Sequence, residues 1–309
     1  MKCKFCGKPA VIKLRAYNLK LCDDHFVSFI EQRVEKTVKK YKLFKRDDRI
    51  LVGVSGGKDS LNTIFILNKL GYKTEGLYID LGIGSYSENS KEKALKFAEE
   101  FGMKIHIYEV KKDFGMGITE IARLLKRKPC SVCGVIKRYI LNKYAYENNF
   151  SVLATGHNLD DETATLFSNI LSWQEGYLAR QNILLPQKSE KLVKKVKPLA
   201  LISEKESAAY AFLKGIDYIK EECPNAHGAT SIFYKNIINQ IEEKQPSTKL
   251  RFYLDFIRKG RKFFQNVLIE REEKLQPCEV CGFPTTRKVC LYCSIKDAIQ
   301  KRGGNNGTR

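Results

Sequence analysis

Long apolar runs are absent from this sequence of 309 residues. No stretch approaches the ~20 apolar residues that a membrane-spanning helix requires. The first residues, Met1 to Cys6, also lack the apolar segment of a secretory signal. These absences argue against a membrane partner. We therefore expect a cytoplasmic protein with reduced thiols, whose cysteines are metal ligands or catalytic groups rather than disulfides.

Acidic residues are scarce. The chain has 35 Asp and Glu residues against 55 Lys and Arg residues, a formal net charge of +20. This excess argues against an ordinary metabolic enzyme for neutral substrates and favours a polyanionic partner, here nucleic acid. With 43% hydrophobic and 29% charged residues, the composition is that of a globular protein. The length predicts about two domains.

The ten cysteines fall into three groups. The group at each end consists of two close pairs of possible ligands, and each pair is separated by two residues, a spacing typical of tetrahedral Zn2+ sites. The alternative is a set of reduced surface cysteines paired by coincidence. We predict two zinc ribbons in which the metal is first a folding device. Their ligands would be Cys3, Cys6, Cys22 and His25 at one end, and Cys278, Cys281, Cys290 and Cys293 at the other.

The central group has three cysteines, Cys130, Cys133 and Cys223. Three thiolates can hold a [4Fe–4S] cluster and leave one iron open. Two of them could instead cycle through a disulfide or carry a persulfide. The remaining interpretation is that they are buried structural cysteines. The spacing favours a chemical role and leaves its type open.

A glycine-rich turn follows the first predicted strand of the central region. Arg49–Val54 is a short apolar, β-branched run, and a helical pattern begins at Leu61. The turn between them, Ser55–Ser60, would aim backbone N–H groups and a helix N-terminus at phosphates. It is not a Walker A loop, because Lys58 is followed by Asp59 rather than by Ser or Thr. The alternative is an ordinary strand–turn–helix connection.

Strand and helix patterns alternate in the central region. Thr74–Asp80, Lys104–Val110 and Ser151–Thr155 are predicted strands, and Ser90–Phe101 is a predicted helix. This alternation predicts an α/β fold with a parallel, helix-covered sheet.

Three carboxylates follow the last predicted strand. Asp160, Asp161 and Glu162 come shortly after Gly156, and this combination suggests Mg2+ and phosphate chemistry. The alternative is an acidic helix N-terminus, because carboxylates suit that end of the helix dipole. The residues alone leave the two interpretations about even.

Ser55–Ser60 resembles, over its full length, the PP-loop of the ATP pyrophosphatase family, which cleaves ATP between the α- and β-phosphates. Nearly the whole chain is similar to the tRNA thiolation branch of that family. The zinc-type motifs at both ends are similar to its 2-thiouridine synthetase (TtuA) group and the eukaryotic wobble-uridine relatives. The other matching segments are Pro129–Gly134, Thr155–Asp161, Lys197–Leu199 and Glu222–Pro224.

The resemblance implies a parallel-sheet PP-loop domain of the adenine nucleotide α-hydrolase type, flanked by two small zinc modules. It implies ATP and Mg2+ as cofactors, and a [4Fe–4S] cluster on the three central cysteines. An older interpretation of such enzymes makes two of these cysteines a persulfide and disulfide pair. ATP would lie over Gly53, Val54, Ser55, Gly56, Gly57, Lys58, Asp59 and Ser60, near Ile79, Lys137, Gly156 and Asp161. The catalytic residues would be Cys130, Cys133, Cys223, Lys58, Asp59 and Asp161.

The implied activity is ATP-dependent 2-thiolation of a tRNA uridine, with the T-loop 5-methyluridine favoured. ATP would adenylate the C2 oxygen, sulfur from the three-cysteine site would replace it, and AMP and pyrophosphate would leave. The sulfur donor would be a ubiquitin-like carrier protein with a C-terminal thiocarboxylate, or another sulfide source. A homodimer is expected by family analogy. The alternatives are wobble-uridine thiolation, a lysidine-type or amidotransferase ligase, and a non-catalytic zinc-ribbon RNA-binding protein.

Basic residues are clustered where a tRNA partner would need them. Residues 121–146 carry seven positive charges and no acidic residue. A second cluster lies within residues 188–197. A third mixes basic residues with aromatic ones, which could stack on unpaired bases or belong to the core. The third cluster consists of Arg251, Arg258, Lys259, Arg261 and Lys262 with Phe252, Tyr253, Phe256, Phe263 and Phe264.

These patterns predict an organisation in six parts. They are an N-terminal zinc ribbon over 1–28, a linker helix over 29–48, a PP-loop catalytic domain over 49–229, a basic helical segment over 230–275, a C-terminal zinc ribbon over 276–302 and a disordered tail over 303–309.

Overall fold

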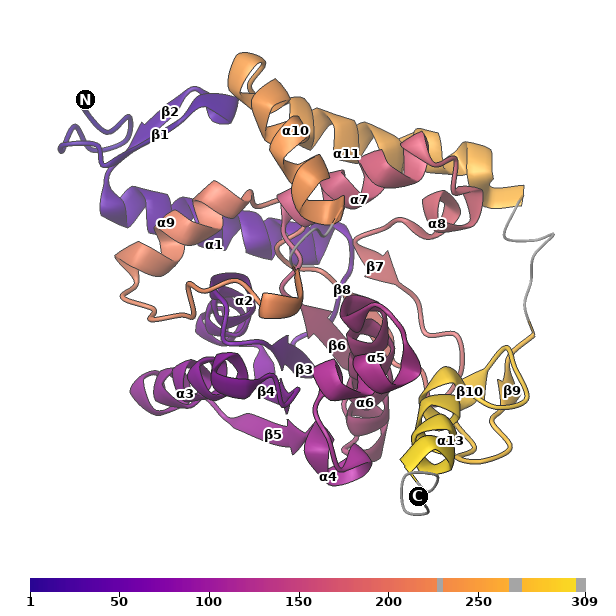
Figure 1. Cartoon of the computed structure of the whole chain (residues 1–309). Coiled ribbons are helices and arrows are strands. Elements are labelled where there is room, and N and C mark those ends of the chain that lie inside the picture. The colour runs from indigo at the N-terminus through magenta and orange to yellow at the C-terminus, as the bar shows by residue number, and fades with distance from the viewer. Residues whose placement is uncertain (227–229, 267–273, 304–309) are drawn as a thin grey trace.

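The computed structural model describes residues 1–226, 230–266 and 274–303 (Figure 1). At its centre is a six-stranded sheet in the order β5-β4-β3-β6-β8-β7. Neighbouring strands are parallel except β7, which runs antiparallel to β8 at the edge. The predicted α/β class with a mostly parallel sheet is confirmed. The strands are β3 (Arg49–Val54), β4 (Lys73–Asp80), β5 (Ile105–Glu109), β6 (Val152–Thr155), β7 (Leu184–Leu185) and β8 (Lys194–Val196).

Helices cover both faces of this sheet. Successive residues of β3 point to opposite faces: Ile50 and Val52 join one buried cluster, and Leu51 joins the other. A strand buried on both sides reads as a continuous apolar run, which is why the sequence revealed β3. The first face carries α1 (Asp23–Lys40), α2 (Lys58–Lys69), α3 (Gly84–Glu100) and α9 (Glu204–Leu213), and the second carries α4 (Val110–Phe114), α5 (Ile118–Leu125), α6 (Pro129–Glu147) and α13 (Leu291–Gly303).

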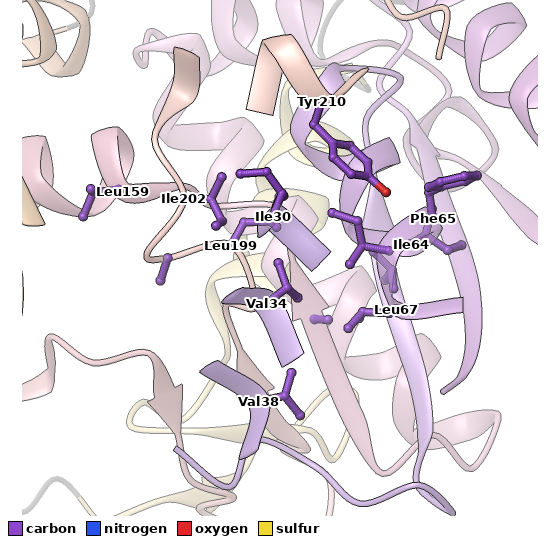
Figure 2. Close-up of a cluster of buried hydrophobic side chains, with 14 of the residues drawn as sticks. Ile30, Val34, Val38, Ile64, Phe65, Leu67, Leu159, Leu199, Ile202 and Tyr210 are labelled. Carbon is purple, nitrogen blue, oxygen red and sulfur yellow. The ribbon is translucent and has the colours of Figure 1, made fainter. Parts of the chain in front are cut away.

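Helix α1 is built into the core of the sheet domain. Ile30, Val34 and Val38 recur every four residues on one side of the helix, and each is at most 1% exposed. They pack beside α2 and the segment before α9 (Figure 2). The helix expected over 29–48 therefore begins earlier, at Asp23, and ends earlier, at Lys40.

Two other predicted helices also begin earlier than expected. The helix predicted over Ser90–Phe101 starts at Gly84, where small polar residues give no apolar periodicity to read. The helix predicted from Leu61 starts at Lys58, so its first turn is made by the glycine-rich motif itself.

Further helices extend from the C-terminal half of the sheet. Helix α7 follows β6, and the pair α10 and α11 packs against it (Figure 1). None of the helices in the described ranges has the length and apolar character needed to cross a membrane. These elements are α7 (Leu159–Leu171), α8 (Glu175–Arg180), η2 (Pro224–Ala226), α10 (Thr230–Lys244), α11 (Thr248–Arg258) and η3 (Gly260–Phe264).

A short antiparallel hairpin stands near each end of the chain. At the N-terminal end β1 (Ile12–Leu14) pairs with β2 (Leu19–Leu21), and η1 (Arg15–Tyr17) makes the turn. At the C-terminal end β9 (Gln276–Pro277) pairs with β10 (Pro284–Thr285). The predicted tail after Gly303, and residues 227–229 and 267–273 of the predicted central segments, lie outside the described residues.

The strand order reverses between β3 and β6, and the region outside the carboxyl ends of these two strands is here called the crevice. The chain moves outward from β3 to β4 and β5, then returns to place β6 on the other side of β3. At such a reversal the loops after the two neighbouring strands diverge, and open α/β sheets bind their ligands there. The loop after β3 is the glycine-rich turn, and the loop after β6 begins with Gly156.

Candidate active site

The glycine-rich turn is held in shape by its own serines. The Ser55 backbone N–H donates to Ser60 Oγ at 3.0 Å, and Ser60 Oγ donates to the Gly57 carbonyl at 2.9 Å. Gly56 has φ +74°, and a Cβ there would stand 2.4 Å from the Ser90 carbonyl oxygen, so only glycine fits. With Gly57 as the N-cap of α2, the free N–H groups of the first helical turn face the crevice. This is the arrangement that binds phosphates.

The loop after β6 lies directly on this turn. A Cβ at Gly156 would stand 2.7 Å from Ser60 N and 2.8 Å from the Asp59 carbonyl carbon. Two residues later, Asn158 caps α7: its Oδ1 accepts from the Asp161 N–H at 3.0 Å, and the Asp161 carboxylate accepts from the Asn158 N–H at 3.1 Å. The cap places Asp161 beside the glycine-rich turn.

Lys58 stands in a network of opposite charges. Its Nζ lies 3.2 Å from Asp59 Oδ2 and 2.8 Å from Glu204 Oε1. Burial opposes the charge on this lysine, but the two carboxylates outweigh burial and raise its pKa. The side chain therefore remains a cation, ready to face a phosphate. Glu204 also pairs with Lys235 at 3.4 Å, and Lys235 pairs with Asp161 at 2.6 Å.

Glu204 and Lys235 are site residues that the sequence did not reveal. Glu204 lies in the first turn of α9, and Lys235 lies on α10. The only local signal is the capping box formed by Ser203 and Glu206, which marks the start of α9 without saying what it faces. Both residues reach the turn through long-range packing.

Asp59 provides the observation that bears most directly on a metal or nucleotide. Burial raises the pKa of its carboxyl. Its Oδ1 is buried and has no hydrogen-bond partner among the described residues, an arrangement that costs free energy unless a ligand completes it. A carboxylate oxygen of this kind, close to Asp161, fits Mg2+ with its bound phosphates.

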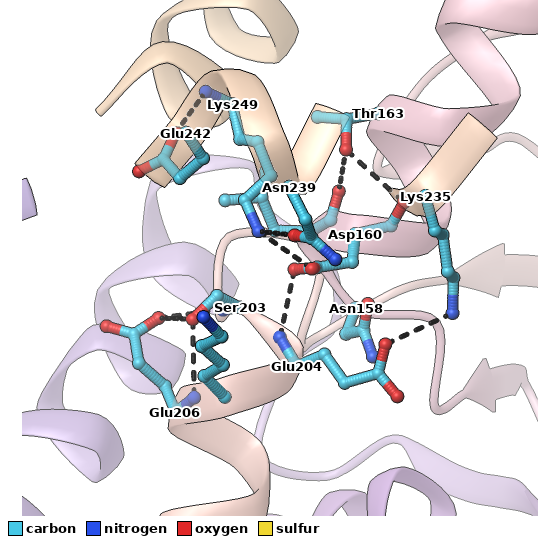
Figure 3. A network of polar contacts seen from close by, with 12 residues as sticks. Asn158, Asp160, Thr163, Ser203, Glu204, Glu206, Lys235, Asn239, Glu242 and Lys249 are labelled. Atoms are coloured by element: carbon cyan, nitrogen blue, oxygen red, sulfur yellow. Dashed lines mark hydrogen bonds and ion pairs between the residues drawn. The ribbon is translucent and has the colours of Figure 1, made fainter. Parts of the chain in front are cut away.

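The other two predicted carboxylates are buried in ion pairs. Asp160 (Figure 3) is 3% exposed; its Oδ1 accepts from Lys249 Nζ at 2.7 Å, and its Oδ2 accepts from the Glu204 N–H at 2.9 Å. Glu162, also 3% exposed, accepts from Lys197 Nζ and Tyr253 OH, each at 2.7 Å. Of the three acids in the first turn of α7, only Asp161 faces the turn, because the other two anchor neighbouring elements.

The central cysteines come from two segments that meet at the crevice. Cys130 and Cys133 lie in the first turns of α6, and Cys223 directly precedes η2. Cys130 Sγ donates to the Asn225 carbonyl at 3.2 Å. The segment before Cys223 is tied to the glycine-rich turn, because the Ile219 N–H donates to the Gly56 carbonyl at 2.9 Å.

The three thiols share one electrostatic environment. Burial raises the pKa of the Cys133 thiol most strongly; neighbouring Lys137 lowers it, and Cys223 and Cys130 raise it. Cys130 is exposed, whereas the other two are partly buried. The three sulfurs are not among the ligand sets of the described chain that lie within 4.8 Å of one another. Three thiolates can each bind one iron of a [4Fe–4S] cluster and leave the fourth iron open.

The remaining predicted nucleotide residues take different positions. Ile79 is 8% exposed on β4 and packs in the second buried cluster. Gly53, beside Val54 on β3, faces Leu141, whose Cδ2 would lie 3.4 Å from an added Cβ. Lys137 lies next to the Cys133 thiol, so its charge acts on the cysteines as well as on the crevice.

The two terminal groups each bring four ligand atoms within 4.8 Å of one another. At the N-terminal end Cys22 Sγ lies 3.2 Å from His25 Nδ1, and Cys6 Sγ lies 3.7 Å from Cys22 Sγ. At the C-terminal end Cys281 and Cys290 have their sulfurs 3.8 Å apart. Each set therefore offers four thiol or imidazole ligands close together and includes at least two buried cysteines, and such a set fits tetrahedral Zn2+.

The C-terminal group packs against the helix that carries the central cysteines. The Tyr292 ring stacks on that of Tyr139 of α6, with centroids 3.8 Å apart and an interplanar angle of 13°. The Tyr292 hydroxyl also donates to the Asp113 carboxylate at the end of α4. The module is therefore in contact with α4 and α6.

Comparisons with known proteins agree with this geometry. The PP-loop domain model matches residues 27–240, and the model of the N-terminal LIM domain of 2-thiouridine synthetase TtuA matches residues 2–27. The tRNA-5-methyluridine(54) 2-sulfurtransferase of Thermotoga maritima is 47% identical over 98% of each chain, and that of Thermus thermophilus is 44% identical over 98% of this chain and 93% of its own.

A solved structure is similar along almost the whole chain. The U34-tRNA thiolase NcsA from Methanococcus maripaludis, with its [4Fe–4S] cluster, has a TM-score of 0.79 and 29% sequence identity, and 96% of each chain is covered. The similarity therefore extends beyond the central sheet to both ends of the chain.

Proposed function

Because this chain belongs to the PP-loop family, in its group of tRNA 2-sulfurtransferases, we propose that it uses ATP to replace the C2 oxygen of a tRNA uridine with sulfur. The observation that carries the proposal is the meeting of three segments at one crevice. The glycine-rich turn contacts Gly156 on one side and accepts a hydrogen bond from Ile219, four residues before Cys223, on the other. A nucleotide on this turn would lie close to sulfur chemistry.

The first step is adenylation of the uridine. The C2 oxygen attacks the α-phosphorus of ATP, the bond to the bridging oxygen of the β-phosphate breaks, and pyrophosphate leaves. Lys58 and the free N–H groups of the turn offset the charge that develops on pyrophosphate. Mg2+ at Asp59 and Asp161 would supply further charge compensation. The step makes the poorly reactive C2 oxygen part of AMP, a good leaving group.

The second step replaces AMP by sulfur. A sulfur nucleophile attacks C2, the C2–O bond breaks, and AMP leaves with the former carbonyl oxygen. A [4Fe–4S] cluster on Cys130, Cys133 and Cys223 supplies, when bound, an iron that is free to hold sulfide. Lys137 beside Cys133 keeps the surroundings of the sulfur positive, which stabilises an anionic sulfur before attack.

The T-loop 5-methyluridine is the favoured substrate. Relatives whose names specify 5-methyluridine at position 54 are 44–47% identical to this chain, whereas the U34 thiolase is 29% identical. Wobble-uridine thiolation is therefore the second candidate.

The proposal extends to the partners of the protein. The sulfur donor would be a thiocarboxylated carrier protein or another sulfide source. The protein would act in the cytoplasm, and it could form a homodimer. The two terminal ligand sets would hold structural zinc.

An in vitro thiolation assay tests the proposal. The protein, with its iron–sulfur cluster reconstituted in the absence of oxygen, is incubated with ATP, Mg2+, sulfide and tRNA that contains 5-methyluridine in the T-loop. The tRNA is then digested, and its nucleosides are analysed by mass spectrometry. We expect 2-thiouridine derivatives from the T-loop, and AMP should form in proportion to the thiolated nucleoside. Thiolation of the wobble uridine instead would select the second candidate. AMP formation without any thiolated nucleoside would contradict the proposal.

Two variants separate the steps. Lys58→Ala should abolish AMP formation, whereas Lys69→Ala, at the exposed end of the same helix, should leave it unchanged. Cys223→Ala should abolish thiolation and retain tRNA binding. Normal thiolation by Cys223→Ala would remove this cysteine from the mechanism.

A further inference from the structure

Three exposed aromatic side chains lie on adjacent segments at the end of α7 that is remote from the glycine-rich turn. Trp173, Tyr177 and Phe263, here called the aromatic platform, are 65%, 63% and 85% exposed. They come from the turn after α7, from α8, which is labelled beside α7 in Figure 1, and from η3, which packs against α8. The Trp173 ring meets Phe264 edge-on, with centroids 6.1 Å apart. Large apolar rings left in solvent on adjacent segments indicate a binding surface.

Trp173 occupies a backbone position that usually belongs to glycine. Its φ is +48°, in the left-handed region that strains a residue with a Cβ. The Trp173 N–H donates to the Ile170 carbonyl at 3.1 Å, and the Gln174 N–H donates to the Asn169 carbonyl at 2.8 Å, which closes α7. An exposed tryptophan at such a position gains little from packing. The backbone therefore does not explain why a tryptophan stands at this position.

Basic side chains stand next to the aromatic platform, and one acidic residue, Glu175, lies between Trp173 and Tyr177 in the sequence. Arg258, Arg261 and Lys262 stand at the end of α11 and on η3, and none of them pairs with a carboxylate of the described residues. Lys259 has an exposed partner, Asp255, at 3.6 Å. Arg261 has a buried Nε with no hydrogen-bond partner in the part of the chain described. Exposed rings beside cations that have no carboxylate partner within the described ranges suit a ligand that combines flat bases with phosphates.

We propose that the aromatic platform stacks on unpaired bases of the tRNA substrate while the neighbouring Arg and Lys side chains contact its phosphates. The proposal takes its partner from the proposed function and adds the surface. A second copy of this chain fits less well, because a two-fold interface would place this positive patch against itself. Exposed rings beside cations are typical of single-stranded RNA recognition.

The position of the platform defines a second contact on the tRNA. Helix α7 runs from its cap at Asn158, beside the glycine-rich turn, to Leu171, directly before the platform. Its 13 residues, at about 1.5 Å each, correspond to about 20 Å. The platform would therefore hold unpaired nucleotides about 20 Å from the glycine-rich turn, and α7 would fix the distance between the two contacts.

Trp173 is the only tryptophan in the chain and reports on this surface directly. The full-length protein is titrated with labelled tRNA; anisotropy measures binding, and tryptophan emission is followed in parallel. We expect emission quenching that saturates together with binding, and reduced access of acrylamide to the indole in the complex. Binding of tRNA with unchanged emission and unchanged acrylamide access would overturn the proposal.

Substitutions at the same position provide the second test. Trp173→Ala should weaken tRNA binding on the order of tenfold, the loss of one stacked base, and Trp173→Tyr should restore most of it. Phe212→Ala is the matched control, because Phe212 is 82% exposed on α9. Trp173→Gly should weaken binding without lowering the thermal midpoint, since glycine tolerates the left-handed backbone. Equal tRNA affinity of Trp173→Ala and the native protein would overturn the proposal.

The outcomes separate this proposal from the proposed function. If tRNA binds with the expected quenching but no thiolated nucleoside forms, the surface stands and the activity fails. If thiolation proceeds and Trp173→Ala retains full tRNA affinity, the activity stands and the surface fails. If Trp173→Ala instead converts a dimer to a monomer in sedimentation, the platform is an interface between copies, and the proposal is overturned.

Discussion

Gly156 lies against the backbone of Ser60, so closely that a Cβ at position 156 would stand 2.7 Å from Ser60 N. The loops after β3 and β6 are thus in direct contact at the crevice. The contact brings the capped start of α7, with Asp161, to the turn that begins α2.

Gly156→Ala should weaken ATP binding at least tenfold, about 1.4 kcal/mol, because the added methyl group has only rigid backbone to displace. Gly134→Ala is the matched control: its methyl group would meet only the mobile end of Arg138, at 3.0 Å. Calorimetric titration with a non-hydrolysable ATP analogue measures both. Native affinity in Gly156→Ala would show that the two loops move apart freely.

Lys249→Met should destabilise the fold by about 3–5 kcal/mol, because it leaves the buried Asp160 carboxylate without its partner. Lys249 and Asp160 are 5% and 3% exposed. Lys259→Met, which breaks an ion pair exposed on both sides, should cost less than about 1 kcal/mol. Urea unfolding gives both values. Adding Asp160→Asn to Lys249→Met should recover part of the loss, and a further loss would contradict the explanation.

Glu75 should make the protein sensitive to acid. Burial would raise its pKa, but Lys104, His106 and Arg49 outweigh burial and lower it from 4.5 to about 2. A depressed carboxyl pKa stabilises the fold above the unfolded value and loses this contribution as the pH falls from 4.5 toward 2. Glu75→Gln should therefore be less stable than the native protein at pH 6, and the difference should shrink by pH 3.

Chemical unfolding at both pH values measures this difference. Glu243→Gln, at a carboxylate that is 65% exposed in its pair with Lys205, is the control and should show no such trend. A Glu75→Gln difference that stays constant from pH 6 to pH 3 would exclude the titration of Glu75 as its source.

Metal analysis should distinguish the three cysteine groups. Cys290→Ser should lose one of two zinc ions per chain and, through the Tyr292–Tyr139 stack, lower the thermal midpoint. Cys130→Ser should keep both zinc ions and lose iron. Elemental analysis of protein purified without oxygen decides the matter. Full zinc content in Cys290→Ser would show that this ligand set does not hold the ion.

The sequence predicted the parts of the site that are local in the chain. Strand β3, the glycine-rich turn and the start of α2 follow one another within Arg49–Ser60, so they form a contiguous motif that can be recognised in the sequence. Glu204 and Lys58 are 146 residues apart, and no periodicity records that they meet. The acidic set after β6 looked uniform, yet packing against Lys249 and Lys197 assigns two of its members to structural roles.

The third basic cluster shows a similar limit. Its aromatic residues could be stacking groups or core, and the structure divides them between the two. Tyr253 and Phe256 on α11 are buried, whereas Phe263 on η3 is exposed. The change from a 3.6-residue to a 3-residue period after Arg258 turns successive rings to different sides, which a single helical period does not anticipate.

Helix α1 limits how this protein can be rearranged during evolution. His25, a predicted zinc ligand, lies in its first turn, and the buried stripe of Ile30, Val34 and Val38 continues along the same helix. No linker therefore separates the N-terminal module from the sheet domain, so the module could not be exchanged as an independent unit. A recombination that replaced the N-terminal module would also replace part of the core of the sheet domain, so the two are expected to be inherited together.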